Sequence, residues 1–309
     1  MSSQPRILIV GHLGQVGVEL QRSFSGLGEI VCHDHDTVDI ADTDQLRAMV
    51  RSVAPDVILN AAAYTAVDRA ESERDTAMAV NAVAPGILAE EALRVGALLV
   101  HYSTDYVFNG SKITPWVETD QPNPLNMYGA SKLAGEEAIE KIGGRYLIFR
   151  TSWVYGPHGN NFFLTMLRLA RERESLNIVD DQFGAPTTSI KLADATRTIV
   201  SGILAGGYGE ADKWAGLYHM TCGGRVSWCG FAQAIFANAR ALLNGKHPAV
   251  HPISSSEYLT PAKRPCNSVL SNEKLLNCFG VRLNSWEAAL DGVIARLAER
   301  NPLPVQAAK

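Results

Sequence analysis

The feature that most constrains the fold is a short apolar run followed at once by regularly spaced glycines. Residues 7–10, Ile-Leu-Ile-Val, are mostly β-branched, which is typical of a buried parallel strand. Gly11, Gly14 and Gly17 follow, and an amphipathic stretch over 18–24 comes next. A strand, a glycine turn and a helix in this order predict the first unit of a doubly wound parallel sheet.

Each of these glycines has a use in a dinucleotide-binding turn. Gly11 permits the tight turn, Gly14 lets the backbone approach a pyrophosphate, and Gly17 allows the helix to pack closely on the sheet. The spacing differs from the commonest form, Gly-x-Gly-x-x-Gly, so a plain strand-to-helix turn is the alternative. The next strand favours the nucleotide site over that alternative.

The second predicted strand, residues 30–34, ends in Asp34. A carboxylate at this place suits the hydroxyls of an unphosphorylated adenosine ribose, whereas a 2′-phosphate prefers an arginine. No arginine stands between residues 23 and 46. The sequence therefore favours NADH, or use of both cofactors, over strict dependence on NADPH. The alternative is that Asp34 belongs to a solvated acidic loop.

Strand and helix signals alternate through the first half of the chain. A strand at 57–60, a helix around 77–95 and a strand at 98–103 repeat the βαβ pattern, and another strand follows at 146–150. The prediction is an α/β fold with a Rossmann-type doubly wound parallel sheet, formed by a dinucleotide-binding domain over residues 1–150.

After residue 150 the pattern changes to scattered aromatic residues, glycines and prolines. Residues 151–309 are therefore predicted to form mainly a smaller C-terminal substrate-binding domain, some segments of which can return to the first domain.

Composition excludes several functional classes for a chain of this size. The 309 residues carry a formal net charge of −4 and no basic run, which argues against nucleic acid as a partner. No apolar stretch approaches the ~20 residues that span a bilayer, and the start lacks a signal-peptide pattern, so we expect no membrane association and a cytoplasmic location. The five cysteines are widely spread and lack Cys-x-x-Cys, which predicts reduced thiols and no zinc site.

Tyr128 and Lys132 stand four residues apart at the start of a predicted helix that runs to about residue 142. At ~3.6 residues per turn they share one helix face. A nearby ammonium favours the phenolate and lowers the pKa of a tyrosine from its usual value of about 10. By itself the pair is often only a helix-surface feature, so the surrounding segments must decide.

Three segments are expected to converge on this pair, because ligands of open parallel sheets lie outside the carboxyl ends of the strands. They are residues 11–17, 61–65 and 103–106. Thr104 and Tyr128 could then hydrogen-bond one carbonyl oxygen while a nicotinamide delivers hydride to its carbon, with Lys132 reaching the nicotinamide ribose. The alternative for Thr104 is a strand end satisfied by local backbone bonds.

Longer segments of the chain resemble the extended short-chain dehydrogenase/reductases, and among them the branch that acts on dTDP-4-dehydro-L-rhamnose. The resemblance covers nearly the whole chain. The segments that carry it are 14–17, 60–63, 65–68, 101–108, 151–155 and 181–187.

This resemblance implies NAD(P)H-dependent reduction of the C4 ketone of dTDP-4-dehydro-L-rhamnose to dTDP-L-rhamnose, which supplies a sugar donor for bacterial surface polysaccharides such as O antigen. It also implies that Tyr128 is the proton donor, that Thr104 positions the reacting oxygen, and that Asp105 and Trp153 hold the deoxysugar. The residues that it assigns to the cofactor, beside Tyr128 and the first and third glycines, are Gly14, Gln15, Val16, Asp34, Asp39, Ile40, Ala63, Tyr64, Thr65, Tyr102 and Lys132.

A dTDP-sugar also needs a group that binds its diphosphate. Arg264, in a basic loop flanked by prolines, can supply two parallel hydrogen bonds, although a solvated turn is the alternative. Asn160 and Asn161 are further candidates for the substrate pocket. Some members of the family dimerise through a carboxylate-bound metal, but residues 187–191 offer no acidic side chain, which argues against Mg²⁺ here. The sequence leaves a homodimer open.

Two other classes share this scaffold. A nucleotide-sugar epimerase or dehydratase is one, but a dehydratase is expected to carry Asp-Glu after Thr104, where this chain has Asp105 and Tyr106. A non-catalytic protein such as the regulatory subunit of methionine adenosyltransferase is the other. The presence of Thr104, Tyr128 and Lys132 argues against it.

Overall fold

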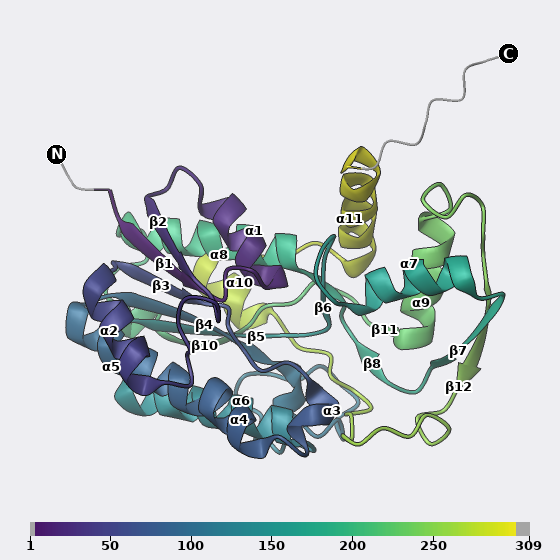
Figure 1. Ribbon diagram of the computed structural model, residues 1–309, viewed down its shortest axis with the longest axis horizontal. Coiled ribbons are helices and arrows are strands. Elements are labelled where there is room, and N and C mark those ends of the chain that lie inside the picture. Colours follow the sequence, from purple (N-terminus) through teal and green to yellow (C-terminus); the bar gives the residue numbers. More distant parts are fainter. Residues whose placement is uncertain (1–3, 301–309) are drawn as a thin grey trace, which may run out of the picture.

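The computed structural model describes residues 4–300, and at its centre lies a six-stranded sheet in the order β10-β5-β4-β3-β1-β2 (Figure 1). Every neighbouring pair of these strands is parallel. The predicted α/β, Rossmann-type sheet is confirmed. Its strands are β1 (Arg6–Val10), β2 (Glu29–His33), β3 (Val57–Asn60), β4 (Leu98–Thr104), β5 (Tyr146–Thr151) and β10 (Gly216–His219).

Helices cover both faces of the sheet, because successive side chains of each buried strand point to opposite sides. Ile7 and Ile9 of β1 join one apolar core with Phe24 of α1, whereas Leu8 joins the other core with Val50 of α2. On the first face lie α1 (Gln15–Phe24) and α8 (Ser189–Leu204); on the second lie α2 (Thr43–Val53), α5 (Ala84–Val95) and α6 (Met127–Ile142).

The helix predicted around 77–95 is interrupted by a wider π turn. Here α4 (Arg74–Met78) passes through η1 (Ala79–Val83) into α5. Such bulges are frequent at functional sites. The side chain of Asn81, inside the π turn, exchanges two hydrogen bonds with the backbone of Tyr64, so it fixes the loop that follows β3.

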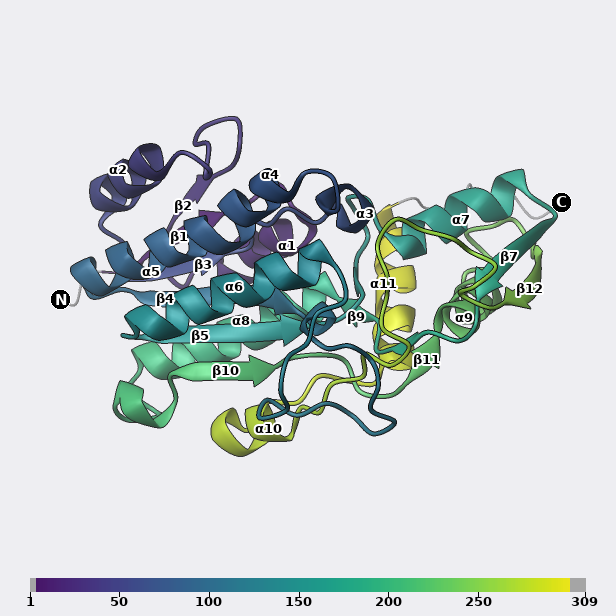
Figure 2. The same ribbon diagram turned by 90° about the horizontal axis from the view of Figure 1, so that it is seen from below.

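A smaller lobe stands beyond the carboxyl ends of the central strands, and the strand arrows in Figure 2 are directed towards it. Its main elements are α7 (Phe162–Glu172), α9 (Trp228–Asn238) and the parallel pair of β7 (Ser175–Val179) and β12 (Ala249–Ile253). The division of the chain at residue 150 stays a prediction, and two segments from the second half, α8 and β10, pack in the sheet domain.

The remaining elements lie within or between these two parts. Within residues 4–300, no helix combines the length and apolarity needed to cross a bilayer. The remaining elements are α3 (Val67–Ala70), η2 (Asp105–Val107), β6 (Val154–Tyr155), β8 (Phe183–Gly184), β9 (Thr187–Thr188), η3 (Ala211–Lys213), β11 (Val226–Ser227), α10 (Glu273–Phe279) and α11 (Trp286–Arg300).

Candidate active site

The glycine-rich turn has no room for side chains at two of its three glycines. Gly11 has a φ of +79°, and a Cβ there would lie 2.6 Å from the Ala62 nitrogen. A Cβ at Gly17 would lie 2.1 Å from the Gly11 oxygen. Gly14 is less crowded: its Cβ would meet only the Gly11 oxygen, at 3.3 Å. Gly14 is also the N-cap of α1 and supplies no side-chain cap, so the first N–H groups of α1 are suited to a phosphate.

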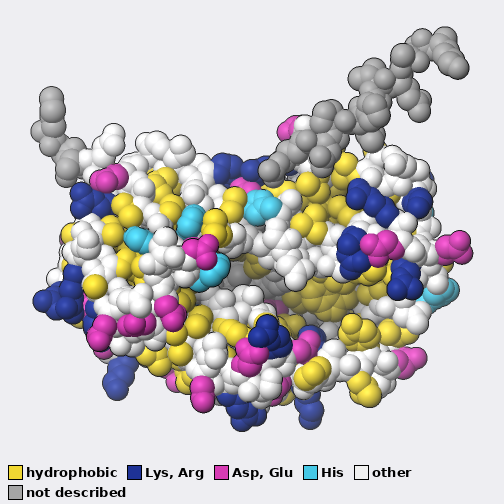
Figure 3. Space-filling model, in the orientation of Figure 1, with side chains coloured by type: hydrophobic (Ala, Val, Ile, Leu, Met, Phe, Trp, Pro, Cys, Tyr) yellow, Lys and Arg dark blue, Asp and Glu magenta, His cyan; other side chains and the backbone are white. Residues whose placement is uncertain are grey.

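A cavity of about 470 Å³ opens beside this turn, at the carboxyl ends of β1, β2 and β3. The space-filling view shows the same face of the molecule hollowed between the sheet domain and the smaller lobe (Figure 3). A cleft at the strand ends is where a dinucleotide binds in such sheets. The residues predicted for the cofactor that line it are Gly11, Gly14, Asp34, Asp39, Ile40, Ala63 and Tyr64.

Asp34 links the glycine-rich turn to the end of β2 by hydrogen bonds. One carboxylate oxygen accepts the Leu13 N–H at 3.0 Å, and the other accepts the His35 N–H at 2.7 Å and also contacts the His35 ring. Burial alone would raise the pKa of Asp34, but these N–H donors hold it below its ordinary value. The cavity therefore has an ionised carboxylate beside it, with histidines close by.

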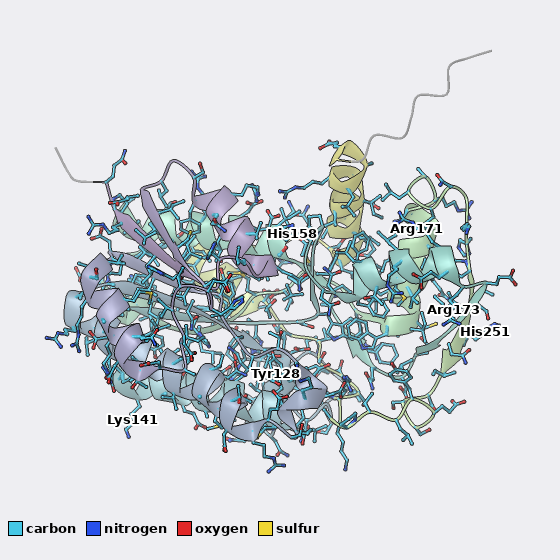
Figure 4. The ribbon with its side chains drawn as sticks, viewed as in Figure 1. Tyr128, Lys141, His158, Arg171, Arg173 and His251 are labelled. Carbon is cyan, nitrogen blue, oxygen red and sulfur yellow. The ribbon has the colours of Figure 1, made fainter. Side chains whose placement is uncertain are left out.

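Tyr128 is brought to the end of β4 by the way α6 begins. Asn126 caps the helix by accepting the Gly129 N–H at 2.8 Å. A Cβ at Gly129 would lie 2.2 Å from the backbone carbonyl oxygen of Tyr106, so only glycine lets α6 approach this backbone so closely. The Tyr128 and Tyr106 rings meet edge to face at 5.9 Å. Figure 4 shows Tyr128 near the middle of the molecule, far from His251 at the outer end of the smaller lobe.

The ionisation of Tyr128 and Lys132 differs from the expectation. Burial raises the pKa of Tyr128 to about 12, with the Thr104 hydroxyl opposing the shift. Burial lowers the pKa of Lys132 to about 7. The expected fall in the pKa of Tyr128 is absent, because Lys132 does not lower it and burial raises it. Tyr128 is therefore a neutral phenol that can donate a proton.

Thr104 and Asp105 form the buried floor next to Tyr128. The Thr104 hydroxyl donates to Asp105 Oδ1 at 3.1 Å and accepts the Tyr106 N–H at 3.1 Å. Burial raises the pKa of Asp105 to about 6, and the nearby hydroxyls of Ser268 and Ser152 oppose the shift, although no hydrogen bond of standard geometry reaches its buried Oδ2 among residues 4–300. An unsatisfied buried acceptor of this kind is suited to a ligand hydroxyl.

Trp153 is held in a strained backbone conformation. Its φ is +46°, which is rare for a bulky residue and is found mainly where function requires it. Its indole stacks on Trp228 with the ring centroids 3.4 Å apart, and a Cβ at Gly184 would lie 2.5 Å from it. Trp153 thus has a fixed position at the junction of the two parts.

Comparison with known proteins assigns the chain to a family. The family described as RmlD substrate binding domain matches residues 5–299. The chain belongs to this family.

The RmlD assignment agrees with full-length relatives. A dTDP-4-dehydrorhamnose reductase of Burkholderia thailandensis is 49% identical over 288 residues, covering 92% of this chain and 96% of the relative. The enzyme of the same name from Escherichia coli K12 is 44% identical, with 94% and 97% covered. A dTDP-4-dehydrorhamnose reductase of Bacillus anthracis, solved in complex with NADP, has a TM-score of 0.86 at 37% identity and covers 95% of this chain and 99% of its own. The predicted resemblance to this reductase branch is confirmed.

Four other residues predicted for the site either have a partner within the protein or are exposed. Arg264 Nη2 donates to Asp68 Oδ2 at 2.9 Å, so the guanidinium already has a carboxylate partner. Asn160 is exposed, and its backbone carbonyl oxygen accepts a hydrogen bond from Gln15 Nε2 at 3.4 Å. The Tyr102 hydroxyl is turned into the core, where it is hydrogen-bonded to Thr196 at 2.7 Å. Thr65 is exposed at the end of the loop after β3.

Several residues that lie near the candidate site were not identified from the sequence. Glu136 binds Arg150 through both carboxylate oxygens, at 2.6–3.2 Å, and Ser103 donates to the same carboxylate. Glu136 follows Lys132 by one helical turn, a spacing that could have pointed to it. Asn60 begins the segment 60–63 that carries the family resemblance, but no role was predicted for it, and nothing in the sequence points to Trp228 or Asn81.

The described part of the chain contains no cluster of metal-ligating side chains. Within residues 4–300, no three histidine, cysteine or acidic side chains come together as a metal site. The buried carboxylate of Glu19 is hydrogen-bonded to Arg22 and Arg296, at 2.6 and 2.9 Å.

Proposed function

We propose that this chain reduces the C4 ketone of dTDP-4-dehydro-L-rhamnose to dTDP-L-rhamnose with NADPH or NADH, in the synthesis of the rhamnose donor for surface polysaccharides. One observation carries the proposal: Tyr128 lies beside the Thr104 hydroxyl at the carboxyl end of β4, and the buried Lys132 follows Tyr128 by one turn of α6. Two relatives that bear the corresponding name match more than nine-tenths of the chain.

The chemistry assigned to each side chain follows from its protonation. The nicotinamide, when bound, supplies the hydride. Tyr128 is a phenol whose pKa is raised to about 12, so it is protonated at neutral pH and can give its proton to the oxygen of the reduced ketone. The Thr104 hydroxyl, 4% exposed, helps to hold that oxygen.

The substrate side of the proposal rests on four residues. Asp105 Oδ2 can accept a sugar hydroxyl, and the fixed indole of Trp153 can pack on the apolar side of a 6-deoxysugar. Arg264 binds the diphosphate if the phosphate oxygens replace or join Asp68. Asn160 is an exposed hydrogen-bonding group that can add a further contact to the substrate. A homodimer and a cytoplasmic location stay predictions.

The experiment supplies the purified chain with dTDP-4-dehydro-L-rhamnose and either NADPH or NADH, and follows the absorbance of the reduced nicotinamide. We expect consumption of cofactor that depends on the sugar, and dTDP-L-rhamnose as the product. The unepimerised 4-keto-6-deoxy-glucose nucleotide serves as the rival substrate. Absence of turnover with both cofactors would refute the proposal, and faster turnover of the rival would reassign the substrate.

A further inference from the structure

Lys132 has an unusual partner for a buried lysine. Its side chain is 1% exposed, and within residues 4–300 its only hydrogen bond joins Nζ to His101 Nε2, at 3.0 Å. Buried ammonium groups are normally paired with a carboxylate. The nearest carboxylate along α6, Glu136, is instead occupied by Arg150 and Ser103.

The next residue along this chain of contacts is Asn60, and its orientation is fixed by the backbone. The Ala62 N–H, which can only donate, lies 3.2 Å from Asn60 Oδ1. The amide nitrogen of Asn60 therefore faces His101 Nδ1, at 3.0 Å, and donates to it. A neutral imidazole that accepts at Nδ1 carries its proton on Nε2, directed at Lys132.

This arrangement suits only one protonation state of the lysine. A neutral amine has a lone pair that can accept the proton on His101 Nε2, whereas an ammonium group has only donors. For Lys132 to be charged, the His101 proton must move to Nδ1. Asn60 must then turn its oxygen towards His101 and give up the bond to Ala62, which lines the cofactor cavity.

We propose that His101, oriented by Asn60, sets the protonation state of Lys132 and thereby acts as a positioning residue for the reduction. This inference rests on the proposed function. His101 is fully buried on β4, so bulk water does not compete for its nitrogens. Burial and the nearby lysine also hold the pKa of His101 well below its ordinary value, which keeps the imidazole neutral.

Few other charges can take over this role. On its own helix Lys132 is one turn from Tyr128 and one turn from Glu136. On β4 it faces His101, behind which lies Asn60 of β3. The charge of Glu136 favours the ammonium form, but Arg150 of β5 compensates it. In the free enzyme Tyr128 ionises far above neutrality, and Asp105, whose pKa is about 6, is already ionised above pH 7. Loss of activity between about pH 7 and 9 therefore reports Lys132.

The decisive variant is Asn60→Asp. This nearly isosteric carboxylate accepts both the Ala62 N–H and a proton on His101 Nδ1, which frees Nε2 to accept from a charged Lys132. We expect the alkaline limb of kcat/KM to move to higher pH by about one unit, so that activity one unit above the wild-type midpoint rises several-fold relative to the maximum. His101→Gln offers an amide oxygen that can accept from a charged Lys132, and it should move the limb in the same direction.

His219→Gln is the matched control, because His219 is also fully buried in the sheet but lies on the edge strand β10, which β5 separates from β4. It should leave the midpoint unchanged. If Asn60→Asp and His101→Gln both keep the wild-type midpoint, or move it to lower pH, the proposal is overturned. If Asn60→Asp does not fold, His101→Gln alone decides by the same criterion.

A second measurement separates this inference from the proposed function. Fluorescence of bound NADPH is titrated against pH, without any sugar. A charged Lys132 binds ribose hydroxyls better, so Asn60→Asp should retain NADPH binding about one pH unit further than the wild type. If the wild type turns over no dTDP-sugar, the proposed function fails while this titration still tests His101; an unshifted titration would overturn the inference alone.

Discussion

The two sides of the cleft are built by different means. On the cofactor side the chain presents backbone, glycines and half-buried loop residues, and the start of α1 has no side-chain cap. On the catalytic side Ser103, Lys132, Glu136 and Arg150 are at most 4% exposed, and they bond to one another or to His101. One side is an open surface and the other is a closed polar network.

This difference matches what each side must do. A dinucleotide has to enter and leave in every turnover, so its site can rely on N–H groups and on space that glycine leaves free. Proton transfer needs fixed groups in a medium of low polarity, where each charge acts strongly and an unpaired one is costly. Changes on the catalytic side should therefore affect rate and stability, and changes on the cofactor side should affect mainly cofactor affinity.

The largest expected effect is the loss of the proton donor in Tyr128→Phe. General acid catalysis contributes roughly 10²–10⁴-fold, so we expect kcat to fall by that factor while NADPH binding is kept. Steady-state kinetics with the dTDP-sugar and a fluorescence titration of NADPH measure the two quantities. Tyr106→Phe, which keeps the neighbouring ring, is the control and should retain most of the rate. A Tyr128→Phe enzyme of near wild-type rate would mean that another group is the acid.

Glu136→Gln tests whether the catalytic side depends on its buried ion pair. Leaving Arg150 without its carboxylate should lower the free energy of unfolding by about 3–5 kcal/mol. The same change at Glu137, an exposed residue on the same helix, should have little effect. Urea unfolding of both variants measures the difference. Equal stabilities would contradict the view that this network is a closed unit.

The sequence predicted the cofactor side better than the catalytic side, for a physical reason. Glycines that must lie against backbone, as Gly11 and Gly17 do, leave a regular spacing in the sequence. The sheet was predicted for a similar reason, because its buried parallel strands form continuous apolar runs such as 7–10 and 98–103.

The buried network could not be predicted in this way, because its members come from four different elements. His101 lies within an apolar strand, Asn60 ends another, and Arg150 is the second-last residue of a third, while Glu136 lies on a helix. Only the tertiary fold brings these side chains together. The expectation of a lowered pKa for Tyr128 was wrong for the same reason. The spacing of four residues indicated a nearby lysine, but it could not indicate the burial that raises the pKa of Tyr128.

A smaller effect is expected from alanine in the glycine turn, where two positions separate stability from binding. The Cβ of Gly17→Ala would lie 2.1 Å from a backbone oxygen, and such overpacking should lower stability by about 1–3 kcal/mol. Gly14→Ala has only a 3.3 Å contact and should unfold at nearly the wild-type temperature. Because Gly14 lies at the start of α1, it should nevertheless weaken NADPH binding. Thermal unfolding and NADPH titration of both variants test this; equal losses of stability would remove the distinction.

The smallest effect concerns the choice between cofactors. Asp34→Arg replaces a carboxylate beside the cavity with the group that a 2′-phosphate prefers, so the ratio of kcat/KM for NADPH over NADH should rise several-fold. Asp36→Arg adds the same charge at an exposed neighbour and should change the ratio less. Asp34 also holds the Leu13 N–H, so Asp34→Arg should weaken binding of both cofactors while it changes their ratio. If the ratio stayed constant as both affinities fell, the carboxylate would act only by shaping the turn, and selection of the ribose would have to come from the histidines beside it.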